Sequence, residues 1–287
     1  MERRAFIKMH GLGNDFVVLD RRAGGEMPTA EVARRIADRR LGVGCDQLLV
    51  LLPSSRAAAF MRILNPDGSE AEACGNGTRC VGRLLMEESR ADLVTIETVA
   101  GVLEVAADAR SYTVDMGAPR FGWREIPLAR PAETLGLDLI HGPLARPVAV
   151  NLGNPHAVFF VDDVGAIPLA DLGPAIEHHG LFPERTNVEV VEVRDRRTLR
   201  VRVWERGAGI TPACGSGACA ALVAAVRLGR TGRTAEVVLD GGTLRIDWSE
   251  PGRVLMTGSA EISYRGELAP ALLRAEPPVA TLEPALS

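Results

Sequence analysis

The segment Ala-Cys-Gly-x-Gly occurs twice in this chain, at Ala73–Gly77 and again 140 residues later at Ala213–Gly217. The same offset, without a gap over about sixty positions, relates further polar residues, as expected of a duplicated domain. The related positions are Asn14 with Asn154, Gln47 with Asn187, Arg62 with Arg202, Asn65 with Glu205, and Cys74 with Cys214. We therefore expect two similar domains that bring two cysteines toward one shared cleft.

The order of elements within each copy predicts the fold class. In both copies, strand-like segments lead into the glycine-rich run, which opens a helix near Gly77 in the first copy and after Gly217 in the second. The helix Cys219–Leu228 is almost without a polar face, which indicates burial on most sides. We predict an α+β fold of two pseudo-symmetric duplicated domains. Each is a mixed, mostly antiparallel, curved β-sheet wrapped around a central helix.

The repeat also predicts domain limits. We place the N-terminal half at residues 1–118 and the C-terminal half at 119–261, and we expect the segment 262–275 to pack back on the first half. The segment Ala118–Pro147 carries five prolines and is expected to be a connector with little regular structure. Residues 276–287 are expected to form a frayed tail.

Composition limits the classes of partner and location. Lys+Arg number 33 against 37 Asp+Glu, for a formal charge of −4. This balance argues against nucleic acid or an anionic membrane as a partner. No apolar run approaches the roughly 18 residues of a membrane span, and the start lacks a signal-peptide core. We expect a cytoplasmic protein with a small-molecule substrate, and a homodimer as the commonest oligomer.

The cysteines point to reactivity rather than to cross-links. Five cysteines, an odd number, argue against a disulfide framework, and their spacing does not match a zinc site, so no metal is expected. Cys45, Cys80 and Cys219 fit small buried hydrophobes. Cys74 and Cys214 instead stand directly before Gly-x-Gly and a helix.

A helix N-terminus favours negative charge. Its free N–H groups and dipole are expected to lower a cysteine pKa from about 8.5, and glycines let a ligand carboxylate approach the backbone. The structural alternative is a tight turn with a space-filling cysteine, and one copy alone would not decide between them. Two copies in register favour the functional interpretation.

Two opposed thiols suit inversion at one carbon. One thiolate removes an α-proton while the other thiol delivers a proton to the opposite face, which describes a two-base racemase or epimerase. A pyridoxal phosphate enzyme needs a Schiff-base lysine, and the chain has one lysine, Lys8. Nor is there a Walker loop or a dinucleotide fingerprint. We expect no cofactor.

Positions that differ between the two copies indicate which residues recognise the substrate. Glu205 replaces Asn65, and Arg206 replaces Pro66. An acid beside an arginine can bind an ammonium group and a second carboxylate, although a surface ion pair is the common alternative. His156 replaces Phe16 and can tune a nearby thiol or serve a structural role.

The motifs together resemble diaminopimelate epimerase from about Phe6 to Gly258. The matching segments are Gly11–Phe16, Gly44–Gln47, Asn65–Ser69, Ala73–Gly77, Gly153–His156, Pro183–Asn187, Glu205–Gly209 and Ala213–Cys219. Ile210 and Pro212 depart from the usual pattern, in the loop that enters the second helix.

The resemblance implies an isomerase that interconverts LL- and meso-2,6-diaminopimelate in lysine and peptidoglycan-precursor biosynthesis, without metal or cofactor. It implies Cys74 and Cys214 as the catalytic pair, with His156 and Glu205 modulating the thiol pKa values. The substrate contacts that it implies are Asn14, Gln47, Asn65, Gly75, Asn76, Asn154, Asn187, Glu205, Arg206, Gly215 and Ser216.

From the residues alone, two further hypotheses stay open. One is a proline-type or hydroxyproline-type racemase on the same duplicated scaffold, for which Arg206 would have no second carboxylate to bind. The other is an amino-acid-binding protein without catalysis. It would keep its ligand affinity after Cys74→Ala, but it gives no reason for two matched thiols.

Overall fold

The computed structural model describes residues 4–72, 74–108, 111–249 and 252–273. The expected frayed tail, residues 276–287, lies outside the described residues, as do Ala73 and the last two positions of the segment 262–275.

The first half of the chain alternates short strands with two helices. It comprises β1 (Ala5–Gly11), β2 (Asn14–Asp20), α1 (Ala30–Ala37), β3 (Gln47–Leu52), β4 (Ala59–Leu64), β5 (Glu70–Ala71), α2 (Gly75–Ser89), β6 (Leu93–Thr98), β7 (Gly101–Asp108) and β8 (Ser111–Asp115). Thr29 is the N-cap of α1, because its hydroxyl accepts from the N–H of Val32.

The second half repeats this order. It comprises β11 (Val148–Asn151), β12 (Pro155–Val161), the 3₁₀ turn η1 (Val164–Ala166), α3 (Leu169–Glu177), β13 (Asn187–Asp195), β14 (Thr198–Glu205), β15 (Gly209–Thr211), α4 (Gly215–Arg227), β16 (Thr234–Leu239), β17 (Gly242–Asp247) and β18 (Leu255–Gly258). The connector contains only β9 (Ile140–His141), β10 (Leu144–Ala145) and an isolated bridge at Arg120. After β18 come β19 (Glu261–Glu267) and α5 (Pro270–Leu273).

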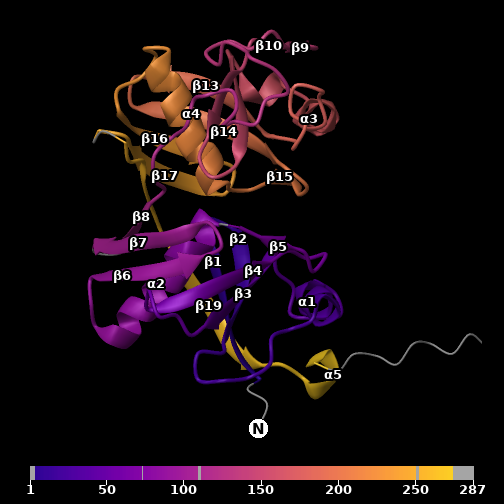
Figure 1. The fold of residues 1–287 in the computed structure, drawn as a ribbon, viewed down its shortest axis with the longest axis vertical. Helices are drawn as coiled ribbons and strands as arrows, with labels where there is room; N and C mark the ends of the chain where they lie inside the picture. Colours follow the sequence, from indigo (N-terminus) through magenta and orange to yellow (C-terminus); the bar gives the residue numbers. More distant parts are fainter. Residues whose placement is uncertain (1–3, 73, 109–110, 250–251, 274–287) are drawn as a thin grey trace, which may run out of the picture.

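Each half is a curved sheet around one helix. Most strand pairs are antiparallel, and the parallel pairs are repeat-related: β2–β3 with β12–β13, and β4–β6 with β14–β16. α2 contacts strands of the first half and α4 contacts strands of the second (Figure 1). Residues Ala218–Ala225 of α4 are all fully buried, which explains the missing polar face. The predicted α+β fold of two duplicated halves is confirmed.

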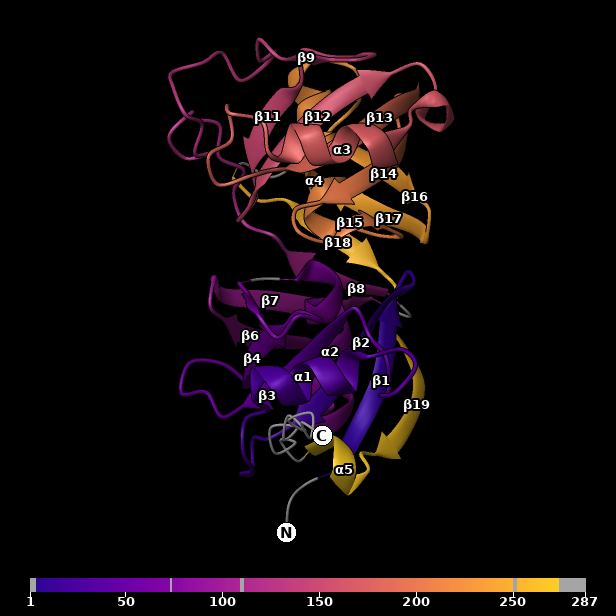
Figure 2. The same ribbon diagram turned by 90° about the vertical axis from the view of Figure 1, so that its right-hand side faces the viewer.

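The halves join through equivalent strands. β8 pairs antiparallel with β18, so one sheet runs through both halves, stacked along the long axis in Figure 2. After β18 the chain returns to the first half, where β19 pairs with β1. In the connector, Arg120 forms a bridge with Asn151 of β11, which belongs to the second half. On this pattern we propose the domain limits 118/119 and 261/262.

The two central helices begin earlier than expected. α2 begins at Gly75 and α4 at Gly215, two residues before the expected starts near Gly77 and Gly217. The reason is that each cysteine is itself the N-cap and the following Gly-x-Gly forms the first turn.

Candidate active site

Cys74 and Cys214 occupy the same position on repeat-related helices. Both have extended backbone angles, φ −149° and ψ 105° at Cys74 and φ −115° and ψ 115° at Cys214. Each Sγ accepts from the N–H three residues on, at 3.4 Å from Gly77 N and 3.4 Å from Gly217 N. Each sulfur therefore lies over the first turn of its helix, among N–H groups that have no partner within the helix.

The N-termini of α2 and α4 converge on one side chain. A Cβ on Gly75 would lie 2.7 Å from Cε of Met256, and a Cβ on Gly215 would lie 2.8 Å from its Sδ. Asn76 of α2 crosses between the halves, since its Nδ2 donates to the carbonyl oxygen of Ala213 at 3.0 Å and to Oδ1 of Asn14 at 3.1 Å. The fold thus brings both cysteine-bearing turns to one place.

The pKa values of both thiols move in the opposite direction from our expectation. Burial raises the pKa of Cys74 to about 12, with a contribution from Glu205, while the Gly77 N–H and Arg79 lower it. Burial raises the pKa of Cys214 well above its usual range, and Glu205 and Glu189 add to this. The prediction of lowered pKa values is wrong for the ligand-free protein, because desolvation of the thiolate outweighs the helix N-terminus.

His156 contacts Glu189, a carboxyl group that acts on Cys214. Its ring lies fully buried, with Nδ1 2.7 Å from Oε1 of Glu189 and Nε2 2.8 Å from Oδ1 of Asn154. Burial raises the pKa of Glu189, and His156 lowers it. A Cβ on Gly217 would lie 2.9 Å from Oε1 of Glu189, so this carboxyl packs under the first turn of α4.

Glu189 was not among the residues predicted from the sequence, although the repeat carries its signal. Leu49 occupies the related position, and Phe16 corresponds to His156. The strand registers agree as well, because Phe16 pairs with Gln47 and His156 with Asn187. One half therefore has a buried Phe–Leu pair where the other has a buried His–Glu pair.

Glu205 and Arg206 lie at the end of β14. The Glu205 carboxylate accepts from the Thr211 hydroxyl, and burial raises its pKa while hydrogen bonds with Thr211 and Cys214 lower it. The Arg206 N–H donates to Oδ1 of Asn187 at 2.9 Å, and its Nη1 donates to the carbonyl oxygen of Glu184 at 3.0 Å.

The remaining predicted contacts form short hydrogen-bonded sets. Gln47 Nε2 donates to Asn65 Oδ1 at 3.0 Å, and Asn65 Nδ2 donates to Ser69 Oγ at 3.1 Å. In the second half, the Ser216 hydroxyl lies 3.6 Å from Sγ of Cys214, and Asn187 Nδ2 donates to the carbonyl oxygen of Pro155 at 2.9 Å.

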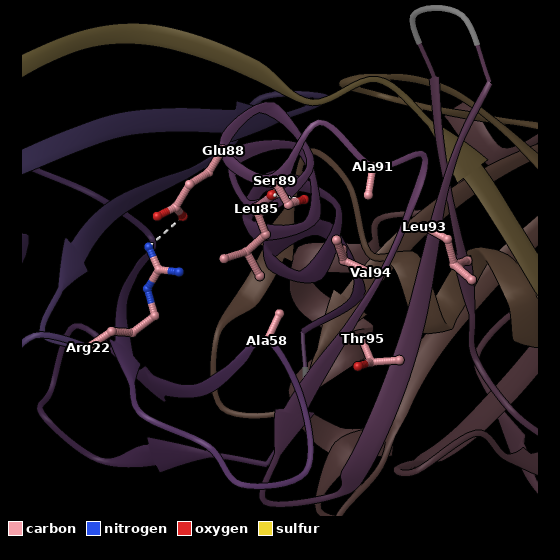
Figure 3. Close-up of a pocket in the computed structure, with 9 residues that line it drawn as sticks. All are labelled: Arg22, Ala58, Leu85, Glu88, Ser89, Ala91, Leu93, Val94 and Thr95. Carbon is pink, nitrogen blue, oxygen red and sulfur yellow. Dashed lines mark hydrogen bonds and ion pairs between the residues drawn. The ribbon is translucent and has the colours of Figure 1, made fainter.

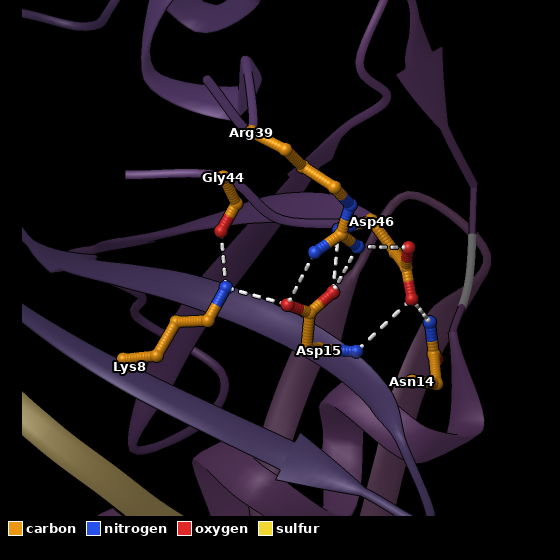
Figure 4. Close-up of polar contacts among 6 residues, drawn as sticks. All are labelled: Lys8, Asn14, Asp15, Arg39, Gly44 and Asp46. Carbon is orange, nitrogen blue, oxygen red and sulfur yellow. Dashed lines mark hydrogen bonds and ion pairs between the residues drawn. The ribbon is translucent and has the colours of Figure 1, made fainter. Parts of the chain in front are cut away.

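A network of charged residues orients Asn14, as Figure 4 shows. Oδ2 of Asp46 accepts from Asn14 Nδ2 at 2.9 Å, and its Oδ1 accepts from Arg39 at 2.7 Å. Arg39 also contacts Asp15 at 2.6 Å, and Lys8 reaches Asp15 at 2.6 Å. Asn14 Oδ1 in turn lies 4.0 Å from Sγ of Cys74. The motifs Gly11–Phe16 and Gly44–Gln47 thus include two carboxylates that sequence analysis did not single out.

Two surface cavities lie away from the cysteines. One of about 530 Å³ lies between the C-terminal end of α2 and β6, with the Arg22–Glu88 ion pair at its edge (Figure 3). Its walls are mainly apolar and contain no cysteine or histidine. The other, of about 350 Å³, lies near Thr29 and Leu273. Neither suits proton transfer at carbon.

The residues that the structure describes contain no cluster of three or more His, Cys, Asp or Glu side chains suited to a metal ion. No helix in this part of the chain has the length and apolarity needed to cross a membrane.

Comparisons with known proteins place this arrangement among relatives. A family model described as diaminopimelate epimerase matches residues 6–122 and 148–263. A protein of Rhodospirillum centenum named diaminopimelate epimerase is 56% identical over 274 residues, covering 94% of each chain. One of Acidiphilium cryptum with the same name is 53% identical over 271 residues, covering 94% of this chain and 98% of the relative.

Solved structures of more distant proteins share the fold. A hydroxyproline epimerase from Agrobacterium vitis superposes with a TM-score of 0.68 at 18% identity, covering 93% of this chain and 92% of that one. A Bacillus anthracis phenazine biosynthesis protein of the PhzF family gives 0.65 at 19% identity, covering 94% and 100%. At this level of identity the likeness concerns the fold alone.

Proposed function

This chain belongs to the diaminopimelate epimerase family, and on that premise we propose which of its residues carry the reaction. The protein is an isomerase that interconverts LL- and meso-2,6-diaminopimelate in lysine and peptidoglycan-precursor biosynthesis. The proposed catalytic pair is Cys74 and Cys214. The observation that carries this assignment is the convergence of both cysteine-bearing helix N-termini on Met256.

The proposed chemistry is proton transfer on opposite faces of one carbon. One cysteine, as thiolate, takes the α-proton and becomes a thiol, while the other thiol gives its proton to the opposite face and becomes a thiolate. The reacting α-carboxylate is bound by the first N–H groups of the two helices, at Gly75, Asn76, Gly215 and Ser216. Because burial raises the pKa of both thiols, formation of the thiolate depends on the positive field of those N–H groups and on the displacement of water by the substrate.

Recognition of an ammonium group and of the second carboxylate is assigned to the asymmetric residues. We propose that Glu205 binds an ammonium group of the substrate and Arg206 its second carboxylate, with Asn154 and Asn187 beside them. The hydrogen bond between Glu205 and Cys214 supports a place for Glu205 beside the reacting carbon, and Arg206 follows it directly at the end of β14. Asn14, Gln47 and Asn65 are proposed to line the first half of the same site.

Two residues are proposed to modulate the thiols. Glu205 interacts with both Cys74 and Cys214, and His156 affects Cys214 through Glu189 and Glu205. A cofactor-independent reaction is supported by the position of Lys8, whose Nζ is buried against Asp15 and the Gly44 carbonyl. That amine is not free to form a Schiff base.

We further propose a cytoplasmic homodimer. The proposed location is supported by the five cysteines, which argue against the disulfide framework of an oxidising compartment, and the proposed dimer by the prevalence of two-fold oligomers. Light scattering after size exclusion tests the oligomeric state.

A deuterium exchange experiment tests the function. The reduced protein is incubated in D2O with LL-diaminopimelate, a chelator and no pyridoxal phosphate, and the α-proton and the stereoisomers are followed. We expect deuterium at the α-position together with meso product. Exchange with proline instead would favour a proline-type racemase, and no exchange with either substrate would contradict the proposed chemistry.

A further inference from the structure

Arg79 is a buried cation next to the proposed site. It lies in α2, is fully buried, and is among the largest fully buried side chains. Its Nε donates to the carbonyl oxygen of Ser259 at 3.2 Å, and its Nη1 lies 3.4 Å from Sδ of Met256. Its Nη2 has no hydrogen-bond partner, and no carboxylate in the described ranges forms an ion pair with it.

The surrounding backbone makes room for this guanidinium. A Cβ on Gly11 would lie 2.9 Å from Nη2 of Arg79, and a Cβ on Gly258 would lie 3.3 Å from its Cζ. A buried charge without a counter-ion is costly, because it loses its hydration without a compensating interaction. A buried ionisable group of this kind is a candidate for a functional role.

Cys74 is the thiol best suited to be that anion. Cys74 is the N-cap of the helix that carries Arg79, and Met256 contacts both Arg79 and Gly75, the residue after Cys74. Arg79 also acts electrostatically on Cys74, Cys80 and Cys219. Cys80 and Cys219 are fully buried in the core. Cys74 is partly exposed and also accepts from the Gly77 N–H.

The second thiol has the opposite surroundings. The position related to Arg79 in α4 is Cys219, which carries no positive charge. Cys214 faces two carboxyl groups, Glu205 and Glu189, and Glu189 shares a hydrogen bond with His156. Glu205 also raises the pKa of Cys74, whereas Glu189 raises that of Cys214 and Arg79 lowers that of Cys74.

Taking the proposed cysteine pair as its premise, we propose that Arg79 is a positioning residue, the internal counter-cation that makes Cys74 rather than Cys214 the first thiol to ionise in the ligand-free protein. The proton that leaves Cys74 goes to solvent, and Cys214 keeps its own. In the singly ionised form of the free protein, Cys74 is therefore the base and Cys214 the acid. After one turnover the assignment is reversed, and proton exchange with solvent restores it.

Thiol titration by alkylation tests this order. The full-length protein is treated with iodoacetamide over a series of pH values, and labelling of each cysteine is read from peptide masses. The pH midpoints are compared rather than the rates, because the two thiols differ in exposure. We expect a lower midpoint for Cys74 than for Cys214 in the unmodified protein. The reverse order, or equal midpoints, would overturn the inference.

Variants of Arg79 test the cause. Arg79→Met is expected to raise the Cys74 midpoint by about one pH unit, a tenfold loss of thiolate at a given pH. It should leave the Cys214 midpoint in place, while Arg79→Lys keeps most of the effect. Arg83→Met, one turn further along α2, is the matched control, because Arg83 pairs with Glu87 and Glu261 and should leave the Cys74 midpoint unchanged. An unchanged midpoint in folded Arg79→Met contradicts the role of the guanidinium.

A second variant covers the case in which Arg79→Met does not fold. His156→Phe combined with Glu189→Leu places the first half's apolar pair under Cys214, and we expect the Cys214 midpoint to fall toward that of Cys74. A rise would contradict the proposed electrostatic difference. Failure of the catalytic assignment is distinguishable, because it would appear as turnover retained by Cys74→Ala, whatever the order of titration.

Discussion

Asn76 donates its side-chain amide to the carbonyl oxygen of Ala213, which lies 137 positions away and directly precedes Cys214. The same nitrogen also reaches Oδ1 of Asn14, so one amide joins three segments around the two cysteines. Asn76 is itself two residues after Cys74 and is almost fully buried. The distance between the two thiols therefore depends in part on a single side chain.

Asn76→Asp tests this contact. An aspartate of the same shape cannot donate to either oxygen, so we expect a loss of about 1–3 kcal/mol in the free energy of unfolding and a larger proportional loss of turnover. Urea unfolding and the rate of LL-to-meso conversion measure the two effects. Ser89→Ala, at the far end of the same helix, is the control and should leave the rate unchanged. An Asn76→Asp protein of full activity would show that the contact does not position the cysteines.

Replacement of either cysteine tests the two-base assignment. Cys74→Ala and Cys214→Ala should each lower epimerisation by at least about 10²-fold, because inversion needs a proton carrier on both faces. Chiral separation of the products measures this. Cys45→Ala is the control, since Cys45 lies in a separate core cluster. Substantial turnover by either alanine variant would refute the pair.

Oxidation should join the two thiols. Two sulfurs that serve one carbon lie near each other, so a mild oxidant is expected to form a Cys74–Cys214 disulfide and abolish activity. Peptide mapping identifies the bridge, and a dithiol should restore the rate. Full activity in protein that is completely bridged would be incompatible with a shared site.

Asp46→Asn tests the network behind Asn14. The carboxylate of Asp46 accepts from Asn14, the Asp15 N–H and Arg39. In the asparagine variant, the side-chain NH2 group would face either Asn14 Nδ2 or Arg39, so that two donors would lie against each other. We expect kcat to fall by roughly tenfold through misplacement of Asn14, since small errors of geometry are costly in catalysis. Steady-state kinetics with Glu70→Gln as a surface ion-pair control provides the measurement. An equal effect of both variants would argue against a positional role.

Asp15 makes the free energy of unfolding depend on pH in the acidic range. Its burial raises the pKa, but hydrogen bonds from Arg39 and Lys8 outweigh this and lower it from 3.8 to about 2. Because the folded pKa is below the unfolded one, the stabilisation is complete above pH 3.8 and is lost as the pH falls toward 2. It amounts to about 2 kcal/mol at neutral pH.

Asp15→Asn should remove this part of the pH dependence. Urea midpoints of the variant and the parent protein are compared at neutral pH and near the folded pKa of Asp15. We expect a large difference at neutral pH that shrinks in acid. A difference independent of pH would mean that Asp15 acts through packing and not through its charge.

Much of the fold was readable because duplication repeats its information. The offset of 140 residues aligned strands, helices and both cysteines, and the Thr29 cap and the hairpin near Gly101 follow local rules of sequence. The short strands β5 and β15 were not predicted, since two or three residues carry no period. The return of β19 to β1 has no local signal either, because it is a pairing between chain ends.

The sequence by itself determined which residues are matched and which are not: two cysteines at helix starts, and Glu205, Arg206 and His156 without equivalents in the first half. Only the tertiary structure decided how charged those thiols are. The N-cap position predicted a lowered pKa, but burial raised it, because desolvation depends on every segment packed around an atom. The same holds for the His156–Glu189 pair and for Arg79, whose surroundings are assembled from segments far apart in the chain.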